Sequence, residues 1–275
     1  MGLPRNDRAT VVCVTGITSA DATGEETIEI TRTAPPLPGR AVAAQRWSNV
    51  AFLHWRVSAA RVAPLLPRGI SPDVEGGSSW VGLIAFELAD ARVGPLATPG
   101  RWGSFTEVNV RLYGVDAEGR RGVVFRSLEA SSLPAVLAAR ALFSLPYVWA
   151  RTGQRPRANG WEYASRRITG PTMRARGARF RLAVDADASQ TVDSDLSRFL
   201  TARWGLYQSR FGRTQWLPNT HEPWVLHPAS VVTLHDELCA AAGLPDVSDR
   251  PPDSVLFSPG VTASFARGTA VPRTE

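Results

Sequence analysis

Hydrophobic residues recur along this chain mainly in short runs with a period of two, which predicts a protein built mostly of β-strands. The run Trp80–Leu88 is almost continuously apolar, which is typical of a strand buried on both faces. Two other runs flank the turn-forming segment 116–119 and predict an antiparallel hairpin. The predicted strands cover residues 49–57, 80–88, 106–113, 121–130 and 177–185.

Fewer segments have the spacing of a helix. Ser132 is a candidate N-cap with Pro134 in the first turn, and the Ala- and Leu-rich run behind them predicts a helix to about Ser144. Helical spacing of apolar residues predicts two more helices, over 196–207 and 234–242, and a short helix follows Ser58. Because the strands mostly lack crossover helices between them, we predict an α+β fold with a mainly antiparallel sheet.

Residues 45–265 are predicted to form one domain, and 275 residues in all are enough for a sizeable core. Residues 1–44 precede it as an N-terminal extension that ends in a proline-rich linker, and residues 266–275 are predicted to be a C-terminal tail. The extension has only a short apolar patch and no cleavage pattern, so no signal peptide is predicted.

All 31 basic side chains of the chain are arginine, so the sequence contains no lysine. Arginine stays protonated, whereas a desolvated lysine can act as an amine nucleophile. No side chain can therefore form a Schiff base or hold pyridoxal phosphate. We expect a protein that works without a cofactor.

Composition also limits the classes of binding partner that we expect for this protein. The net charge is +6, but the arginines are spread out and no nucleic-acid-binding motif is present, so no nucleic-acid partner is expected. No apolar run approaches the ~18 residues of a membrane span. The sequence contains only two cysteines, which is the pattern expected in a reducing cytoplasm. His221, His227 and His235 lack the spacing of known metal motifs, so no metal site is predicted. The oligomeric state stays open, with a homo-oligomer among the options.

The strand over 106–112 is the richest in candidate chemistry. Its period of two places Val108 and Val110 on one face, and Glu107, Asn109 and Arg111 on the other. Neighbours on one face lie about 6.6 Å apart, so these three polar groups can contact one small ligand. The alternative is an ordinary amphipathic strand whose polar face lies in water.

Several segments in order resemble one family: FLHWRVSAARVAPLLPRGI, WVGLIAFEL, FTEVNVRLY, ARALFSLPY, FLTARWGLY and HEPW. Over residues 44–262 the chain looks like the YqjF-like family, which is placed in the acetoacetate decarboxylase-like superfamily. The resemblance implies a mainly antiparallel β-barrel or cone, with the site in its interior and a few helices packed outside.

The resemblance also implies candidate site residues. Glu107 matches an active-site glutamate of acetoacetate decarboxylase, and Arg46 falls near its carboxylate-binding arginine. The Schiff-base lysine of that enzyme follows a helix and a proline, and here Tyr147 follows Pro146 in the same context. Imine chemistry is thereby removed, and acid–base chemistry by a carboxyl group, a phenol and guanidinium groups is what remains. The alternative for Tyr147 is an aromatic residue that closes the core.

Three later residues complete the candidate set. Arg203 lies among apolar residues of the predicted helix, which indicates either a buried ion pair, with Glu107 or Glu129, or an anion-binding group. His221 is either a proton shuttle at the cavity mouth, or part of a turn in which Trp224 anchors a strand.

Three functions from different classes follow from these residues. The first is a cofactor-independent small-molecule enzyme for dehydration, cyclisation, isomerisation or decarboxylation of a carbonyl or carboxylate substrate. In it Glu107 is the acid or base, Tyr147 donates to an oxyanion, and Arg111 or Arg46 binds an anionic group. The second is a non-catalytic ligand-binding or sensor protein that uses the same cavity. The third is an interaction protein with a filled interior and a functional basic surface.

Overall fold

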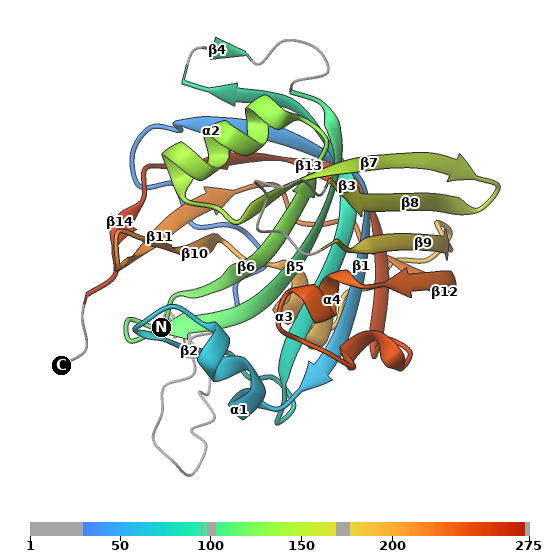
Figure 1. The fold of residues 1–275 in the computed structure, drawn as a ribbon. Coiled ribbons are helices and arrows are strands. Elements are labelled where there is room, and N and C mark those ends of the chain that lie inside the picture. Colours follow the sequence, from blue (N-terminus) through green and yellow to red (C-terminus); the bar gives the residue numbers. More distant parts are fainter. Residues whose placement is uncertain (1–29, 95, 98–102, 169–176, 273–275) are drawn as a thin grey trace, which may run out of the picture.

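The strands of this protein join into a single wrapped sheet (Figure 1). The computed structural model describes residues 30–94, 96–97, 103–168 and 177–272, and within these ranges the sheet has 14 strands. The strands are β1 (Ala43–Val57), β2 (Ile70–Pro72), β3 (Ser79–Val93), β4 (Leu96–Ala97), β5 (Phe105–Asp116), β6 (Arg121–Ala130), β7 (Tyr147–Arg157), β8 (Gly160–Arg167), β9 (Arg179–Ala186), β10 (Gly205–Arg210), β11 (Arg213–Thr220), β12 (His227–Asp236), β13 (Ser254–Phe265) and β14 (Thr269–Ala270).

The helices are short. They are α1 (Ala59–Val62), η1 (Ala63–Leu65), α2 (Leu133–Phe143), α3 (Asp195–Thr201), α4 (Leu238–Ala241) and η3 (Val247–Asp249). Most of the strand pairs are antiparallel, and β6 pairs in parallel with both β7 and β10. The predicted α+β fold with a mainly antiparallel barrel is therefore confirmed. No helix in the described ranges is long and apolar enough to cross a membrane.

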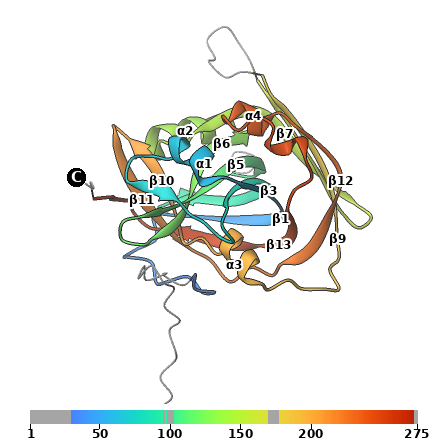
Figure 2. The same cartoon turned by 90° about the horizontal axis from the view of Figure 1, so that it is seen from below.

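The sheet closes on itself twice. Pairing of β5 with β6 and of β11 with β13 adds two closures to the linear strand order. One closed set, the small ring, consists of β1, β3, β5, β6, β10, β11 and β13. The other, the large ring, shares β1, β3, β5, β6 and β13 with it and continues through β7, β8, β9 and β12. Figure 2 shows β10 and β11 on one side of the molecule and β9 and β12 on the other.

The strands that both rings share have both faces buried, because one face of such a strand points into the small ring and the other points into the large ring. On β5, Val108 and Val110 lie in an apolar cluster with Phe180 and Leu182 of the large ring. Glu107 lies on the opposite face and is buried as well. The alternative that the polar face of this strand lies in water is therefore wrong. Trp80–Leu88 is buried on both faces for the same reason, as its apolar run predicts.

A β-bulge in β1 decides which of its side chains face the small ring. Asn49 has a φ of 53°, and the register with β3 shifts between Ser48 and Ala51. The extra residue shifts the alternation of inward-facing and outward-facing side chains along the strand. Trp47 on one side of the bulge and Phe52 on the other consequently point into the same space, although their numbers differ in parity.

Two predicted helices are mostly wrong. The segment 196–207 is helical only to Thr201, because from Gly205 onward the chain pairs with β11 as β10. The segment 234–242 begins as β12, which pairs with β9, and only Leu238–Ala241 is helical. In both places long-range strand pairing overrides a local helical spacing.

Segments on both sides of the predicted domain 45–265 contact that domain. The N-terminal extension lies outside the described residues up to residue 29, and beyond it Trp204 Nε1 donates to the carbonyl of Thr31 at 3.1 Å. Part of the predicted C-terminal tail is a strand, since Thr269 and Ala270 pair with β11.

Candidate active site

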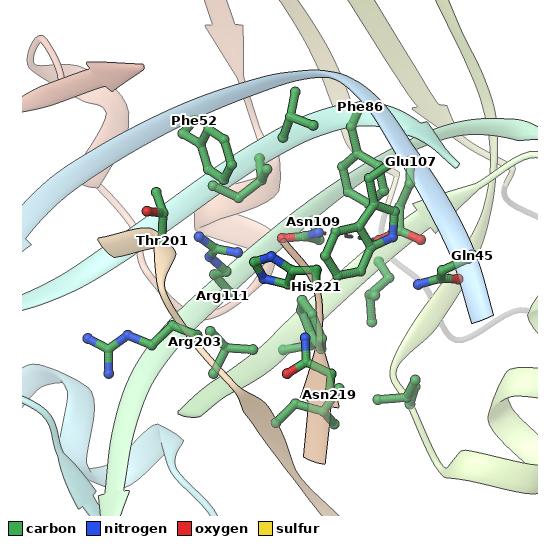
Figure 3. A pocket seen from close by; sticks show the side chains of 18 of the residues that line it. Gln45, Phe52, Phe86, Glu107, Asn109, Arg111, Thr201, Arg203, Asn219 and His221 are labelled. Atoms are coloured by element: carbon green, nitrogen blue, oxygen red, sulfur yellow. Dashed lines mark hydrogen bonds between the residues drawn. The ribbon is translucent and has the colours of Figure 1, made fainter. Parts of the chain in front are cut away.

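The small ring encloses a cavity of about 100 Å³ (Figure 3). Its wall is mostly aromatic and aliphatic, with polar groups at a few positions. The polar and ionisable side chains on it are Gln45, Glu107, Asn109, Arg111, Tyr147, Thr201, Arg203, Asn219 and His221. In Figure 3 Glu107 lies toward one end and Arg203 toward the other, with Asn109, His221 and Arg111 between them in this view.

Glu107 is 2% exposed, and its carboxyl group contacts neutral side chains. The Tyr147 hydroxyl donates to Oε2 at 2.7 Å, and Asn109 Nδ2 donates to Oε1 at 3.2 Å. Burial and, to a smaller extent, the charge of Glu129 raise the pKa of Glu107 to about 7, against the opposing effect of these two hydrogen bonds. The group can therefore both give and accept a proton near neutral pH.

Tyr147 is held at the start of β7. α2 ends at Ser144, which has a left-handed φ of 53°, and Tyr147 then pairs with Leu128 of β6. Burial, together with the charge of Glu107, raises the pKa of the Tyr147 hydroxyl well above its usual value. The phenol consequently stays a neutral hydrogen-bond donor.

Arg111 is held by neutral partners. Its Nε donates to the Tyr113 hydroxyl at 3.0 Å, and Nη2 donates to the carbonyl of Leu200 at 2.9 Å. His54 supports this arrangement, since its Nε2 lies 2.8 Å from the same hydroxyl. Among the described residues no carboxylate forms an ion pair with Arg111. Its positive charge is therefore free to pair with an anion in the cavity.

Arg203 lies just beyond α3, between Thr201 and β10. Its Nε donates to the carbonyl of Phe199 at 2.6 Å, and its Nη1 forms an ion pair with Asp73. The predicted partners, Glu107 and Glu129, are wrong, because Glu129 pairs instead with Arg167 in the large ring. The expected buried ion pair is present, but with a carboxylate 130 residues away in the sequence.

Positive charge exceeds negative charge beside the cavity. Asp73 also pairs with Arg121 at 3.2 Å, so one carboxylate serves two guanidinium groups. Arg111 and Arg203 both lie over the Tyr113 ring, and Arg111 has no carboxylate partner among the described residues. Burial lowers the pKa of His54 well below its usual value, and the charges of Arg111 and Arg203 lower it further. This end of the cavity therefore favours an anionic ligand group.

Several cavity residues carry buried polar atoms that have no hydrogen-bond partner within the described part of the chain. Two are donors, Trp47 Nε1 and Arg203 Nη2, and two are acceptors, Asn109 Oδ1 and Asn219 Oδ1. Leaving a buried polar atom unpaired costs about 1–3 kcal/mol, so such atoms call for an explanation. Their position on one cavity indicates a polar ligand that supplies both acceptors and donors.

The segment containing His221 and Trp224 lies between β11 and β12 and closes one side of the cavity. The Trp224 ring stacks on Trp47 at 6.0 Å and 9°, and its Nε1 donates to the carbonyl of Thr201 at 3.0 Å. His221 Nδ1 lies 2.7 Å from the carbonyl of Glu222, which fixes Nδ1 as a donor and leaves Nε2 as the acceptor of the neutral ring. Burial lowers the pKa of His221. Both residues line the cavity, and Trp224 also has an anchoring contact.

Arg46 is the one predicted site residue that lies elsewhere. Its side chain is 51% exposed and pairs with Asp90 at 3.0 Å. The neighbours Gln45 and Trp47 point into the cavity, so alternation along β1 directs Arg46 outward. An anion-binding role for Arg46 is therefore not supported, and Arg111 and Arg203 are the guanidinium groups on the cavity.

Sequence reasoning did not find Trp47, Asn219 or the supporting pair His54 and Tyr113. Asn219 and Trp47 lie on strands far apart in the sequence, and the bulge at Asn49 hides the phase of β1. Alternation gives a signal only for Tyr113, which shares a face with Arg111 on β5. Among the described residues no group of His, Cys, Asp and Glu side chains could hold a metal ion.

A family described as uncharacterized conserved protein, DUF2071, matches residues 44–262. The chain belongs to the DUF2071 family. It is also 31% identical over 187 residues to the protein YqjF of Bacillus subtilis (strain 168), covering 67% of this chain and 75% of that protein. The YqjF-like resemblance of the sequence is thereby confirmed.

Solved structures show what fold this DUF2071 protein shares. An acetoacetate decarboxylase-like enzyme from Sphingomonas wittichii RW1 matches with a TM-score of 0.57 and 11% identity, over 86% of this chain and 95% of that one. Acetoacetate decarboxylase from Legionella pneumophila matches with a TM-score of 0.54 and 13% identity, over 93% and 98%. The enduracididine biosynthesis enzyme MppR complexed with pyruvate matches with a TM-score of 0.54 and 16% identity, over 91% and 95%. The DUF2071 chain thus has the acetoacetate decarboxylase-like fold.

Proposed function

We propose that this protein is a small-molecule enzyme that moves a proton on a carbonyl compound carrying a carboxylate, without a Schiff base. One observation carries the proposal: a buried carboxyl group, Glu107, faces the cavity and is bound by Tyr147 and Asn109, and no cation within the described ranges is paired with it. A carboxyl group with a purely structural role in this position would be expected to have an arginine partner, as Glu129 has in Arg167.

The chemistry begins with the carboxylate form of Glu107. It accepts a proton from the carbon next to the substrate carbonyl, the electron pair of that C–H bond forms a C=C bond, and the π pair of the carbonyl moves onto its oxygen. Once protonated, Glu107 no longer needs the hydrogen bond from Tyr147, so the phenol can turn to the developing oxyanion. Returning the proton at another atom gives isomerisation. Loss of a β-hydroxyl as water gives dehydration, and attack of the enolate on a second carbonyl gives cyclisation.

Decarboxylation would use the same groups in another order. This applies to a 3-oxo acid, in which the C–C bond to the carboxylate breaks, carbon dioxide leaves, and the electron pair forms the enolate of the remaining carbonyl group. Protonated Glu107 then supplies the proton to carbon. Each of the four reactions therefore needs a proton donor or acceptor at Glu107 and a hydrogen-bond donor at the oxyanion.

Arg111 and Arg203 bind the carboxylate in this proposal. Arg111 has no carboxylate partner in the described chain, and Nη2 of Arg203 is a buried donor without one. Glu107 and Arg111 are four residues apart on β5, so their Cα atoms are separated by about 13 Å, with Asn109 between them. The two ends of the cavity can thus hold the two functional groups of one small molecule.

The known ligands of a structural neighbour support the substrate class. MppR has been obtained with pyruvate and with the condensation product of pyruvate and imidazole 4-carboxaldehyde. Pyruvate has a carbonyl group next to a carboxylate, which is the combination that Glu107, Tyr147 and the two arginines suit. The cavity also argues against an interaction protein with a filled interior.

Deuterium exchange tests the proposal directly. Pyruvate or 2-oxobutanoate is incubated with the protein in D₂O, and loss of the C3 proton signal is followed by NMR. We expect wild-type protein to accelerate the exchange and Glu107→Gln to reduce it to the rate without protein. Equal rates for the two proteins would contradict the proposal. Tight binding of the oxo acids without exchange would favour the sensor function instead.

A further inference from the structure

A second, apolar cavity lies between α2 and the strands beside the candidate site. It has a volume of about 310 Å³. Five residues line both cavities: Gln45, Leu145, Tyr147, Leu206 and Phe265. The two cavities therefore adjoin at Tyr147, and we refer to the second one as the α2 groove.

The α2 groove is lined mostly by apolar side chains, with Gln45, Arg92 and Tyr147 as its polar members. One face of α2 contributes Leu142 and three alanines, Ala135, Ala138 and Ala139, whose small side chains leave space beneath the helix. Across from them lie residues of β3, including Val93. Leu142 is 52% exposed and Val93 is 46% exposed, although both are large and apolar. Exposed apolar side chains that gather at one opening are typical of a binding groove.

The volumes indicate what kind of molecule uses the groove. Small-molecule sites usually measure about 300–1,000 Å³, so a cavity of about 100 Å³ suits only a small polar head. The α2 groove adds about 310 Å³ that offers contacts to hydrocarbon. The α2 groove, which adjoins the polar cavity at Tyr147, offers the additional space that a ligand of ordinary size needs.

The order of the groups fixes the direction of such a ligand. Arg111 and Arg203 line only the polar cavity, Glu107 and Tyr147 come together by a hydrogen bond, and Tyr147 reaches the groove. From the arginines outward, the cavity thus offers contacts to a carboxylate, then a carbonyl with its neighbouring carbon, then an apolar chain. An unbranched 2-oxo acid has its groups in this order.

We propose that the α2 groove binds the unbranched alkyl chain of the substrate, and that the substrate is a medium-chain 2-oxo acid rather than a short one. This inference rests on the proposed function, from which it takes the position of the carboxylate and carbonyl. It adds the specificity-determining residues of the groove, of which Ala138 and Leu142 are the most accessible to substitution.

Calorimetric titration with pyruvate, 2-oxohexanoate and 2-oxooctanoate tests the inference. A buried methylene contributes about 0.8 kcal/mol, so affinity should rise about fourfold with each added carbon until the groove is filled. Ala138→Phe should remove this rise while leaving pyruvate binding unchanged. Ala141→Phe is the matched control, because Ala141 is exposed on the same helix and does not line the groove.

A second pair of variants guards against an effect on folding. Leu142→Glu places a charge at the groove, and Leu137→Glu places one at a position that is 57% exposed and outside it. Only the first should weaken binding of 2-oxooctanoate, by about tenfold or more, with equal melting temperatures. Affinity that is independent of chain length, or equal behaviour within each pair, would overturn the inference.

The same titration separates this inference from the proposed function. If short acids bind and exchange deuterium, and affinity does not increase with chain length, the proposed function is supported and the role of the groove is contradicted. If long acids bind better but exchange no deuterium, the role of the groove is supported and the proposed function is contradicted. If no member of the series binds at millimolar concentration, both are overturned.

Discussion

The Tyr147 hydroxyl donates a 2.7 Å hydrogen bond to the carboxyl group of Glu107. Glu107 lies on β5, which both rings share, and Tyr147 is the first residue of β7, which belongs to the large ring. The contact joins two groups with raised pKa values, one at about 7 and one well above the usual value for tyrosine. Such a pair holds a proton near neutral pH next to the cavity.

Tyr147→Phe should lower the rate of deuterium exchange by about 10²–10³, which is the usual cost of losing one oxyanion donor. The ring still packs, so the melting temperature should change little. Tyr163→Phe is the control, because Tyr163 is also buried and donates to a backbone carbonyl, but lies outside the cavity. Exchange at the wild-type rate in Tyr147→Phe would show that Tyr147 is a packing residue and that another group stabilises the oxyanion.

The exchange rate should rise with pH through about 7, because the proton acceptor is the ionised form of Glu107. Tyr147→Phe should move this midpoint upward, since the hydrogen bond from Tyr147 stabilises the carboxylate and lowers its pKa. NMR exchange measurements between pH 5 and 9 would check both. A midpoint that stays the same in Tyr147→Phe would mean that the titrating group is not Glu107.

Glu107 should make the fold less stable as the pH rises. Its pKa is raised from 4.5 to about 7 in the folded protein, so between these values the folded state binds more protons than the unfolded chain. The free energy of unfolding therefore falls across this window, by at most about 3 kcal/mol. Urea denaturation at pH 5 and pH 8 should show this loss in wild type and in the exposed control Glu118→Gln, and a smaller loss in Glu107→Gln. Equal losses in all three would contradict the assigned pKa.

Arg111→Gln should raise the KM for a 2-oxo acid by about 10- to 100-fold, because a hydrogen-bonded charge contributes about 1.5–3 kcal/mol. Arg46→Gln is a matched control on the neighbouring surface, where Arg46 pairs with Asp90 and does not line the cavity. We expect its KM to equal that of wild type. Steady-state measurements of exchange would give both values, and a larger effect in Arg46→Gln would place the anion-binding group outside the cavity.

Sodium borohydride should not inactivate the protein in the presence of a 2-oxo acid. The chain has no lysine, so the domain provides no amine that could form a reducible imine with the substrate. Mass spectrometry of the treated protein would check this directly. A reduced substrate adduct within residues 45–265 would refute the acid–base mechanism.

By itself, the sequence determined the chemistry that is excluded and the local geometry of β5. The absence of lysine removes imine formation whatever the fold. The period of two along a strand follows from backbone geometry alone, so it placed Glu107, Asn109 and Arg111 on one face before any partner was known. Ser132 and Pro134 likewise located the start of α2, since capping is a local interaction.

Tertiary structure decided which groups meet. Arg203 pairs with Asp73 rather than with Glu107 or Glu129, because the closure of the small ring brings residues 130 positions apart into contact. The bulge at Asn49 shifts the alternation along β1, so that Phe52 faces the cavity together with Trp47, and the pairing of β10 with β11 ends α3 at Thr201. Burial of both faces of β5 also depends on β8 and β9, which are distant in sequence. Local spacing carries the direction of a side chain along its own strand, but only long-range pairing fixes what that side chain faces.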